Sequence, residues 1–190
     1  SPFKDLCGAG VAFKLCAALE GCEDPAELLE PFGELAALGT IADVMPLVGE
    51  NRTIVKEGLA TLQDTLRPGL QALLENAGYA DRPVTAETVS YGLAPRLNAA
   101  GRMDTAAVAL KLLLCENEEQ AAGIAARLSE INTSRQQAEQ QIAAAALEKL
   151  SADPARVLDR VIVVSGEGWH PGVIGIVATR LMEKYGRPSI

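Results

Sequence analysis

The strongest restriction on the fold of this chain comes from a long stretch without helix breakers. Residues 116–150 contain no proline and a single glycine. Apolar residues recur there at steps of three and four, the spacing of one face of an α-helix: Ile124, Leu128, Ile131, Ala138, Ile142, Ala145 and Leu150. An unbroken helix of this length measures about 50 Å. Because compact domains rarely hold so long a helix, we expect it to connect two lobes.

Most of the remaining sequence also favours helices. Hydrophobic residues make up 48% of the 190 residues but aromatic residues only 4%, so the core must consist mainly of Ala, Leu, Val and Ile. Helical spacing predicts helices over residues 8–20, 51–66, 68–77 and 105–114. Another helix begins at Asp24-Pro25, and Gly39 either ends it or marks a tight approach. Residues 94–104 are interpreted as a loop, at most with one turn of helix.

The last part of the chain has a different pattern. Val161–Val164 is a continuous β-branched run, which predicts a buried strand. A glycine-rich loop over residues 165–172 and a helix over 173–185 follow, as in the first half of a βαβ unit. We therefore expect a predominantly α-helical chain with a long connector helix and the start of an α/β domain.

Charge and cysteine content narrow the possible environments. A net charge of −8 argues against a surface that binds nucleic acid everywhere, but leaves open a local basic cleft or a metal-bridged site. The four cysteines form no CxxC pair, which favours free thiols in a reducing cytoplasm. No stretch approaches the roughly 18 apolar residues of a membrane span.

One carboxylate, Asp43, lies inside the apolar run Gly39–Leu47. An acid among apolar neighbours is expected to need a partner. Asp43 either caps a neighbouring helix and binds backbone amides, or it is a ligand of Mg²⁺ or Mn²⁺, which prefer oxygen donors.

Two further segments carry candidate binding residues. Arg96, Asn98 and Arg102 precede a predicted helix N-terminus, a place that attracts anions such as phosphate. Alternatively, this is a surface loop in which Arg102 pairs with Asp104 or with a glutamate. Trp169 and His170 lie after the predicted strand, where α/β folds commonly bind ligands. Trp169 could stack on a base and His170 could touch phosphate, or His170 is simply a turn residue.

The long helix carries a polar stripe that contains Arg135. Its other members are Asn132, Gln136 and Glu139. The stripe is either a solvated face or, if the helix bridges two lobes, a face that looks into a cleft and places Arg135 against a nucleic-acid strand.

Three motifs, in this order, carry a resemblance to a known family. They are Leu-Gly-Thr-Ile-Ala-Asp-Val-Met-Pro-Leu, Ala-Pro-Arg-Leu-Asn-Ala-Ala-Gly-Arg-Met and Gly-Trp-His-Pro-Gly-Val-Ile-Gly-Ile-Val-Ala. They closely resemble the RecJ exonucleases, which belong to the DHH phosphoesterase superfamily and are specific for single-stranded DNA. The resemblance implies 5′-to-3′ phosphodiester hydrolysis with Mn²⁺ or Mg²⁺, on a single strand held between two lobes.

The resemblance also implies a division of the chain and roles for its residues. Residues 1–114 match the C-terminal part of a DHH catalytic domain, 115–152 the interdomain helix and 153–190 the N-terminal part of a DHHA1-type domain. Asp43 matches a metal ligand, Asn98 and Arg102 match a motif that we assign to phosphate, and Trp169 and His170 match a loop facing the cleft.

The namesake Asp-His-His is impossible here, because the chain contains a single histidine. We therefore expect a central fragment of a bacterial, cytoplasmic enzyme. Alone it should be inactive, and its exposed apolar faces should favour self-association. Two alternatives stay open: another DHH phosphoesterase acting on oligonucleotides or cyclic dinucleotides, and a non-catalytic helical scaffold. The long helix and the Gly-Trp-His-Pro-Gly loop favour the exonuclease.

Overall fold

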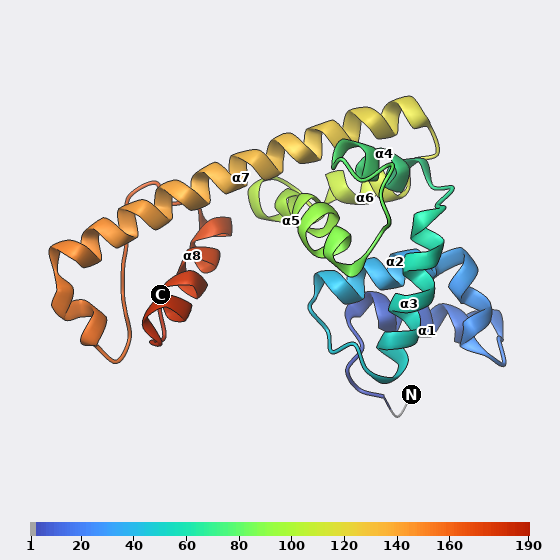
Figure 1. The fold of residues 1–190 in the computed structure, drawn as a ribbon, viewed down its shortest axis with the longest axis horizontal. Coiled ribbons are helices and arrows are strands. Elements are labelled where there is room, and N and C mark those ends of the chain that lie inside the picture. Colours follow the sequence, from blue (N-terminus) through green and yellow to red (C-terminus); the bar gives the residue numbers. More distant parts are fainter. Residues whose placement is uncertain (1–2) are drawn as a thin grey trace.

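A computed structural model describes residues 3–190 as an elongated, helical molecule (Figure 1). Two of its short elements are 3₁₀ helices (η1 and η3) and one is a π-helix (η2). In chain order the elements are α1 (Gly8–Glu20), η1 (Pro25–Leu28), α2 (Leu29–Ala42), α3 (Gly49–Gln63), α4 (Pro68–Asn76), η2 (Thr88–Leu93), α5 (Ala94–Met103), α6 (Ala107–Leu113), α7 (Glu118–Ala152), η3 (Pro154–Leu158) and α8 (Pro171–Tyr185). No helix in residues 3–190 is both long and apolar enough to cross a membrane.

Helix α7 runs along nearly the whole molecule and confirms the predicted connector (Figure 1). It is 35 residues long and begins after Asn117, whose Oδ1 accepts a hydrogen bond of 2.8 Å from the backbone N–H of Gln120. Its N-terminal half packs on α4, α5 and α6, and its C-terminal half packs on α8. Because a single unbroken helix serves both ends, the two ends are held at a defined separation.

Two apolar cores lie at opposite ends of α7. Ala121, Ala125 and Leu128 of α7 belong to a core shared with α2 to α6. Ile142, Ala146 and Leu150 belong to a second core, shared with α8 and Ile162. The structure therefore has two lobes joined by one helix, as the sequence predicts.

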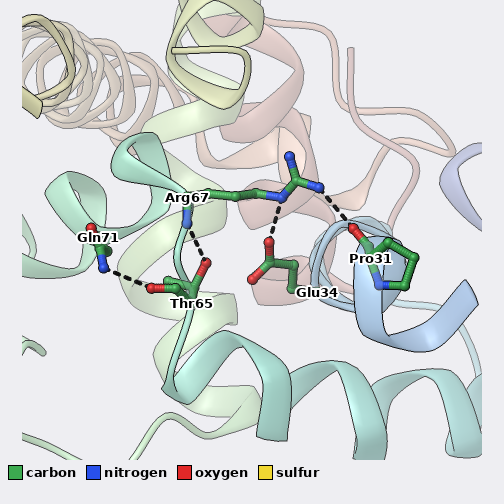
Figure 2. A network of polar contacts seen from close by, with 5 residues as sticks. All are labelled: Pro31, Glu34, Thr65, Arg67 and Gln71. Atoms are coloured by element: carbon green, nitrogen blue, oxygen red, sulfur yellow. Dashed lines mark hydrogen bonds and ion pairs between the residues drawn. The ribbon is translucent and has the colours of Figure 1, made fainter. Parts of the chain in front are cut away.

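In the first lobe, a buried acid fixes the turn between α3 and α4 against α2 (Figure 2). The Glu34 side chain is almost fully buried, and its Oε1 accepts a hydrogen bond of 2.5 Å from Nε of Arg67. A second nitrogen of Arg67 donates to the carbonyl of Pro31 at 2.8 Å. Thr65 completes the turn, since its hydroxyl accepts from the backbone N–H of Arg67 and its carbonyl from Gln71. The charge of Arg67 compensates for the burial of Glu34.

At two places the structure decides or corrects the sequence prediction. Helix α2 passes through Gly39, which marks a close approach to α1: a Cβ there would lie 2.5 Å from Cβ of Ala9. The predicted loop over residues 94–104 is wrong, because helix α5 occupies most of it. Pro95 has no N–H to donate, and it stands directly after the π-helix η2, where the helical hydrogen bonding is already irregular.

The predicted strand at Val161–Val164 is present only as an isolated parallel bridge. Ile162 pairs with Ser189 in residues 3–190. The N–H of Ile162 donates to Pro188, that of Ile190 to Ile162 and that of Val164 to Ile190, at 2.9–3.0 Å. A strand forms where a second segment pairs with it over several residues. Within residues 3–190, only residues 188–190 pair with this segment.

Candidate metal and nucleic-acid site

Asp43 occupies the C-cap position of α2 and is exposed, so the premise of an acid buried among apolar side chains is wrong. Its backbone N–H donates to the carbonyl of Gly39 at 3.0 Å. No hydrogen bond or ion pair to its carboxylate is found within residues 3–190, so the side chain is not used as a helix cap. A free carboxylate oxygen is a suitable donor for a hard cation.

The residue after Asp43 has an unusual backbone conformation. Val44 has φ of 54°, a left-handed conformation that a β-branched residue rarely adopts. Its N–H donates to Ile41 and that of Met45 donates to Thr40, which together form the Schellman ending of α2. The following loop is fastened by buried Asn51, whose Nδ2 donates to the carbonyl of Pro46 at 3.0 Å. The backbone that presents Asp43 is therefore well determined.

The three predicted binding residues of helix α5 lie in different environments. Asn98 and Arg102 are exposed and lie four residues apart, on one face of the helix. Arg96 is half-buried, and its guanidinium donates to the carbonyl of Gly92 at 2.6 Å and to the hydroxyl of Ser129 at 2.9 Å. Within residues 3–190 no ion pair joins Arg102 to Asp104 or to a glutamate; the carboxylate of Asp104 lies 4.0 Å from the guanidinium of Arg127.

In the structure, the Ala-Pro-Arg-Leu-Asn-Ala-Ala-Gly-Arg-Met motif, which contains Arg102, lies in direct contact with the Gly-Trp-His-Pro-Gly loop. A Cβ on Gly172 would lie 2.0 Å from the carbonyl oxygen of Arg102, so only glycine permits this approach. Nη1 of Arg102 lies 3.5 Å from the carbonyl oxygen of Gly172. Gly172 was not predicted as a contact residue, although its place in the Gly-Trp-His-Pro-Gly motif was a signal.

His170 and Trp169 have structural contacts in the second lobe. His170 is the N-cap of α8, and its Nδ1 accepts a hydrogen bond of 3.1 Å from the N–H of Gly172. The ammonium of Lys149 lies 5.7 Å from the centroid of the Trp169 ring, a cation–π distance. Both residues are half-buried, so each keeps part of its surface open to a ligand.

Arg135 makes its contacts inside the protein. Its Nε donates to Oδ1 of Asn132 at 3.2 Å, and its Nη1 pairs with Glu139, whose side chain is 4% exposed. Glu139 also pairs with Arg180 of α8. A fully solvated stripe is therefore wrong for Asn132 and Glu139, which are both buried. The ion pair of Glu139 with Arg180 links α7 to α8. Arg180 was not predicted as a partner, because a single arginine in a predicted helix gives no signal in the sequence.

A complete metal centre is not formed by this part of the chain. Within residues 3–190 there is no group of three or more His, Cys, Asp or Glu side chains that could hold a metal ion. Asp43 fits a hard cation as a single oxygen ligand, and the remaining ligands would have to come from elsewhere.

Sequence comparisons identify relatives along the whole chain, although no protein-family model matches it. The chain is 45% identical, over its full length, to the single-stranded-DNA-specific exonuclease RecJ of Bacillus subtilis, of which it covers 23%. It is 39% identical to the protein of the same name in Escherichia coli, of which it covers 35%. The chain thus spans about a quarter to a third of the length of these relatives.

Solved structures agree with the sequence comparison. A crystal structure of RecJ in complex with Mn²⁺ from Thermus thermophilus superposes with a TM-score of 0.84 at 40% identity, over 98% of this chain and 27% of that one. A crystal structure of exonuclease RecJ bound to manganese gives 0.85 at 41% identity, over 98% of this chain and 46% of that one. In both sequence and fold, along nearly its entire length, this chain matches a segment of RecJ proteins.

Proposed function

We propose that this chain forms the central part of an exonuclease that hydrolyses phosphodiester bonds of single-stranded DNA in the 5′-to-3′ direction. The observation that carries the proposal is the contact between Arg102 of α5 and Gly172 of α8, which joins the motifs of the two lobes. The relatives named as exonucleases specific for single-stranded DNA, and the manganese in related structures, support the substrate and the metal.

We assign residues 1–114 to the C-terminal part of a DHH domain, 115–152 to the interdomain helix and 153–190 to the N-terminal part of a DHHA1-type domain. The single strand lies between the two lobes. We place the enzyme in the bacterial cytoplasm, because the relatives come from bacteria and no described helix is suited to a membrane.

In this mechanism the chain supplies one metal ligand and the phosphate contacts. Asp43 offers a carboxylate to Mn²⁺ or Mg²⁺, which when bound activates water and polarises the phosphate. Arg102 and Asn98 hold phosphate oxygens from the exposed face of α5, where a guanidinium can make two parallel hydrogen bonds. Trp169 and His170 contact the strand from the second lobe. Arg96, whose guanidinium is already hydrogen-bonded, supports α5 from within. Arg135 is likewise hydrogen-bonded inside the protein, to Asn132 and Glu139 of α7.

A segment-swapped enzyme tests the proposal: a complete RecJ exonuclease in which this chain replaces the matched segment. We expect D43N and R102A each to lower the rate of single-strand digestion by 10²-fold or more, because both act on charge in the transition state. Asp64→Asn is the matched control for D43N, since Asp64 is also an exposed aspartate at a helix C-cap. Arg82→Ala, at an exposed arginine outside the motifs, is the control for R102A.

The same experiment separates the alternatives. Unchanged digestion in both D43N and R102A would refute the exonuclease proposal and favour a non-catalytic scaffold. Faster hydrolysis of a dinucleotide than of a long single strand would favour a phosphoesterase that acts on short substrates.

The isolated chain should not digest DNA, since Asp43 is one ligand of an incomplete metal site. Incubation of purified residues 1–190 with Mn²⁺ and a 5′-labelled single strand should release no label. Release that disappears in the Asp43→Ala variant would contradict this expectation.

A further inference from the structure

We propose that Arg96 is a positioning residue of this exonuclease, which fixes α5 and thereby the direction of Arg102 and Asn98, and that it does not touch DNA. The inference deepens the proposed function and rests on it. Its evidence lies where α5 meets the π-helix η2 and crosses α7.

The guanidinium of Arg96 holds the last turn of the π-helix. The N–H of Ala94 donates to the carbonyl of Val89, five residues back, so the wide π turn continues into the start of α5. Pro95 follows and has no N–H to donate. Arg96 Nη1 donates to the carbonyl of Gly92 at 2.6 Å, within this same irregular turn. Single π turns inside helices often occur next to functional residues.

The same guanidinium joins α5 to two other helices. Its Nε donates to the hydroxyl of Ser129 on α7 at 2.9 Å. That hydroxyl donates in turn to Oδ1 of Asn76, the last residue of α4. A single side chain therefore fixes the beginning of α5 relative to η2, α7 and α4.

The helix geometry directs Arg96 away from the face of α5 that carries Asn98 and Arg102. Two residues of an α-helix correspond to a rotation of about 200°, so Arg96 and Asn98 lie on nearly opposite sides. Their environments agree, because Arg96 is half-buried while Asn98 and Arg102 are exposed. Arg96 holds the N-terminal end of α5, and the contact of Arg102 with Gly172 holds the C-terminal end.

Loss of Arg96 should therefore reduce catalysis without removing a phosphate contact. A displacement of about 1 Å at a reacting group can cost about 10²-fold in rate. A direct phosphate contact has a different signature: each one contributes about 0.7 to the slope of log affinity against log salt for a single strand.

The test compares R96A, R96K, S129A and R102A in the segment-swapped enzyme. Binding of a single-stranded oligonucleotide is measured over a range of salt concentrations without divalent metal, and kcat and KM are measured with Mn²⁺. We expect R102A to reduce the salt slope by about 0.7. R96A should leave that slope unchanged and lower kcat by ten- to a hundredfold, with little change in KM.

Two further variants link the effect to the hydrogen bonds. S129A should lower kcat less than R96A, and the double variant should be no worse than R96A alone, because both remove the same connection. R96K should stay impaired, since one ammonium cannot reproduce the fork that reaches Gly92 and Ser129 together. R96K also serves if R96A does not fold.

A reduced salt slope in R96A, full recovery of kcat in R96K, or unchanged kcat in R96A would each overturn the positioning role alone. An unmutated segment-swapped enzyme that fails to digest single strands would overturn the proposed function, and this inference with it.

Discussion

At the scale of single residues, two adjacent residues at the end of α2 have energetically unfavourable features. Asp43 places a negative charge at the negative end of the helix dipole, with no partner for its carboxylate in residues 3–190. Val44 adopts a left-handed conformation although its side chain is 87% exposed and gains little from packing. Such departures from local preference concentrate at functional sites. A bound cation would offset the first of them.

Val44→Gly should stabilise the chain. Glycine adopts φ of 54° without the steric penalty that other residues incur, and relief of that penalty is expected to raise the free energy of unfolding by about 1 kcal/mol. Urea unfolding followed by circular dichroism measures this. Val48→Gly is the control, because Val48 has an ordinary φ of −124°, and that variant should lose stability. A loss in Val44→Gly as well would contradict the strain at Val44.

Glu139→Gln should destabilise the chain, because Arg135 would keep its buried position without a charged partner. We expect a loss of about 1–3 kcal/mol in the free energy of unfolding. Glu130→Gln on the same helix is the control: its ion pair with Arg127 is exposed, and such pairs contribute little. Equal losses of unfolding free energy in the two variants would show that the burial of Glu139 does not increase its contribution to stability.

At the scale of elements, the position of α8 depends on a backbone contact with α5. The first turn of α8 lies against the last turn of α5 so closely that no side chain fits at Gly172. His170 caps the same turn of α8. Any side chain added at position 172 must therefore move one helix relative to the other.

Gly172→Ala should lower the free energy of unfolding and reduce single-strand digestion by the segment-swapped enzyme. The added Cβ would lie 2.0 Å from the carbonyl oxygen of Arg102. Gly175→Ala is the matched control, since nothing lies within 4 Å of a Cβ there and alanine should stabilise the helix by about 1 kcal/mol. If Gly172→Ala behaved like Gly175→Ala, the close contact would not matter in solution.

At the scale of the whole molecule, α7 is the one helix that contributes buried residues to both described cores. Its central part, between Leu128 and Ile142, carries the buried polar residues Asn132 and Glu139 instead of a continuous apolar seam. The two cores are therefore separate, and α7 together with the contact between α5 and α8 sets their relative position.

Gln137→Pro should uncouple the two lobes. Gln137 is exposed in the middle of α7, where proline removes a helical hydrogen bond and costs about 3 kcal/mol or more. Small-angle scattering of the chain should show a changed radius of gyration, with most helical circular dichroism retained. Gln137→Ala should leave both unchanged. A Gln137→Pro variant with unaltered scattering would show that contacts such as that of α5 with α8 suffice to orient the lobes.

Local patterns in the sequence were sufficient for most elements of the fold. The 3.6-residue spacing predicted α7, and Asp24-Pro25 marked a helix start that the structure confirms. These signals succeed because helix formation and capping depend on neighbours a few residues away. The three motifs also indicated the family before any fold was known.

Local patterns could not predict which polar side chains are buried or which residues they contact, because both depend on residues far apart in the chain. Arg96 donates a hydrogen bond to Ser129, 33 residues away in the sequence, and Arg102 contacts Gly172, 70 residues away. The exposure of Asp43 follows from the end of α2, and the burial of Glu139 from the packing of α8 on α7. Which polar side chains remain free for a ligand is thus a result of packing, since a polar group is used internally or left open according to what the fold places beside it.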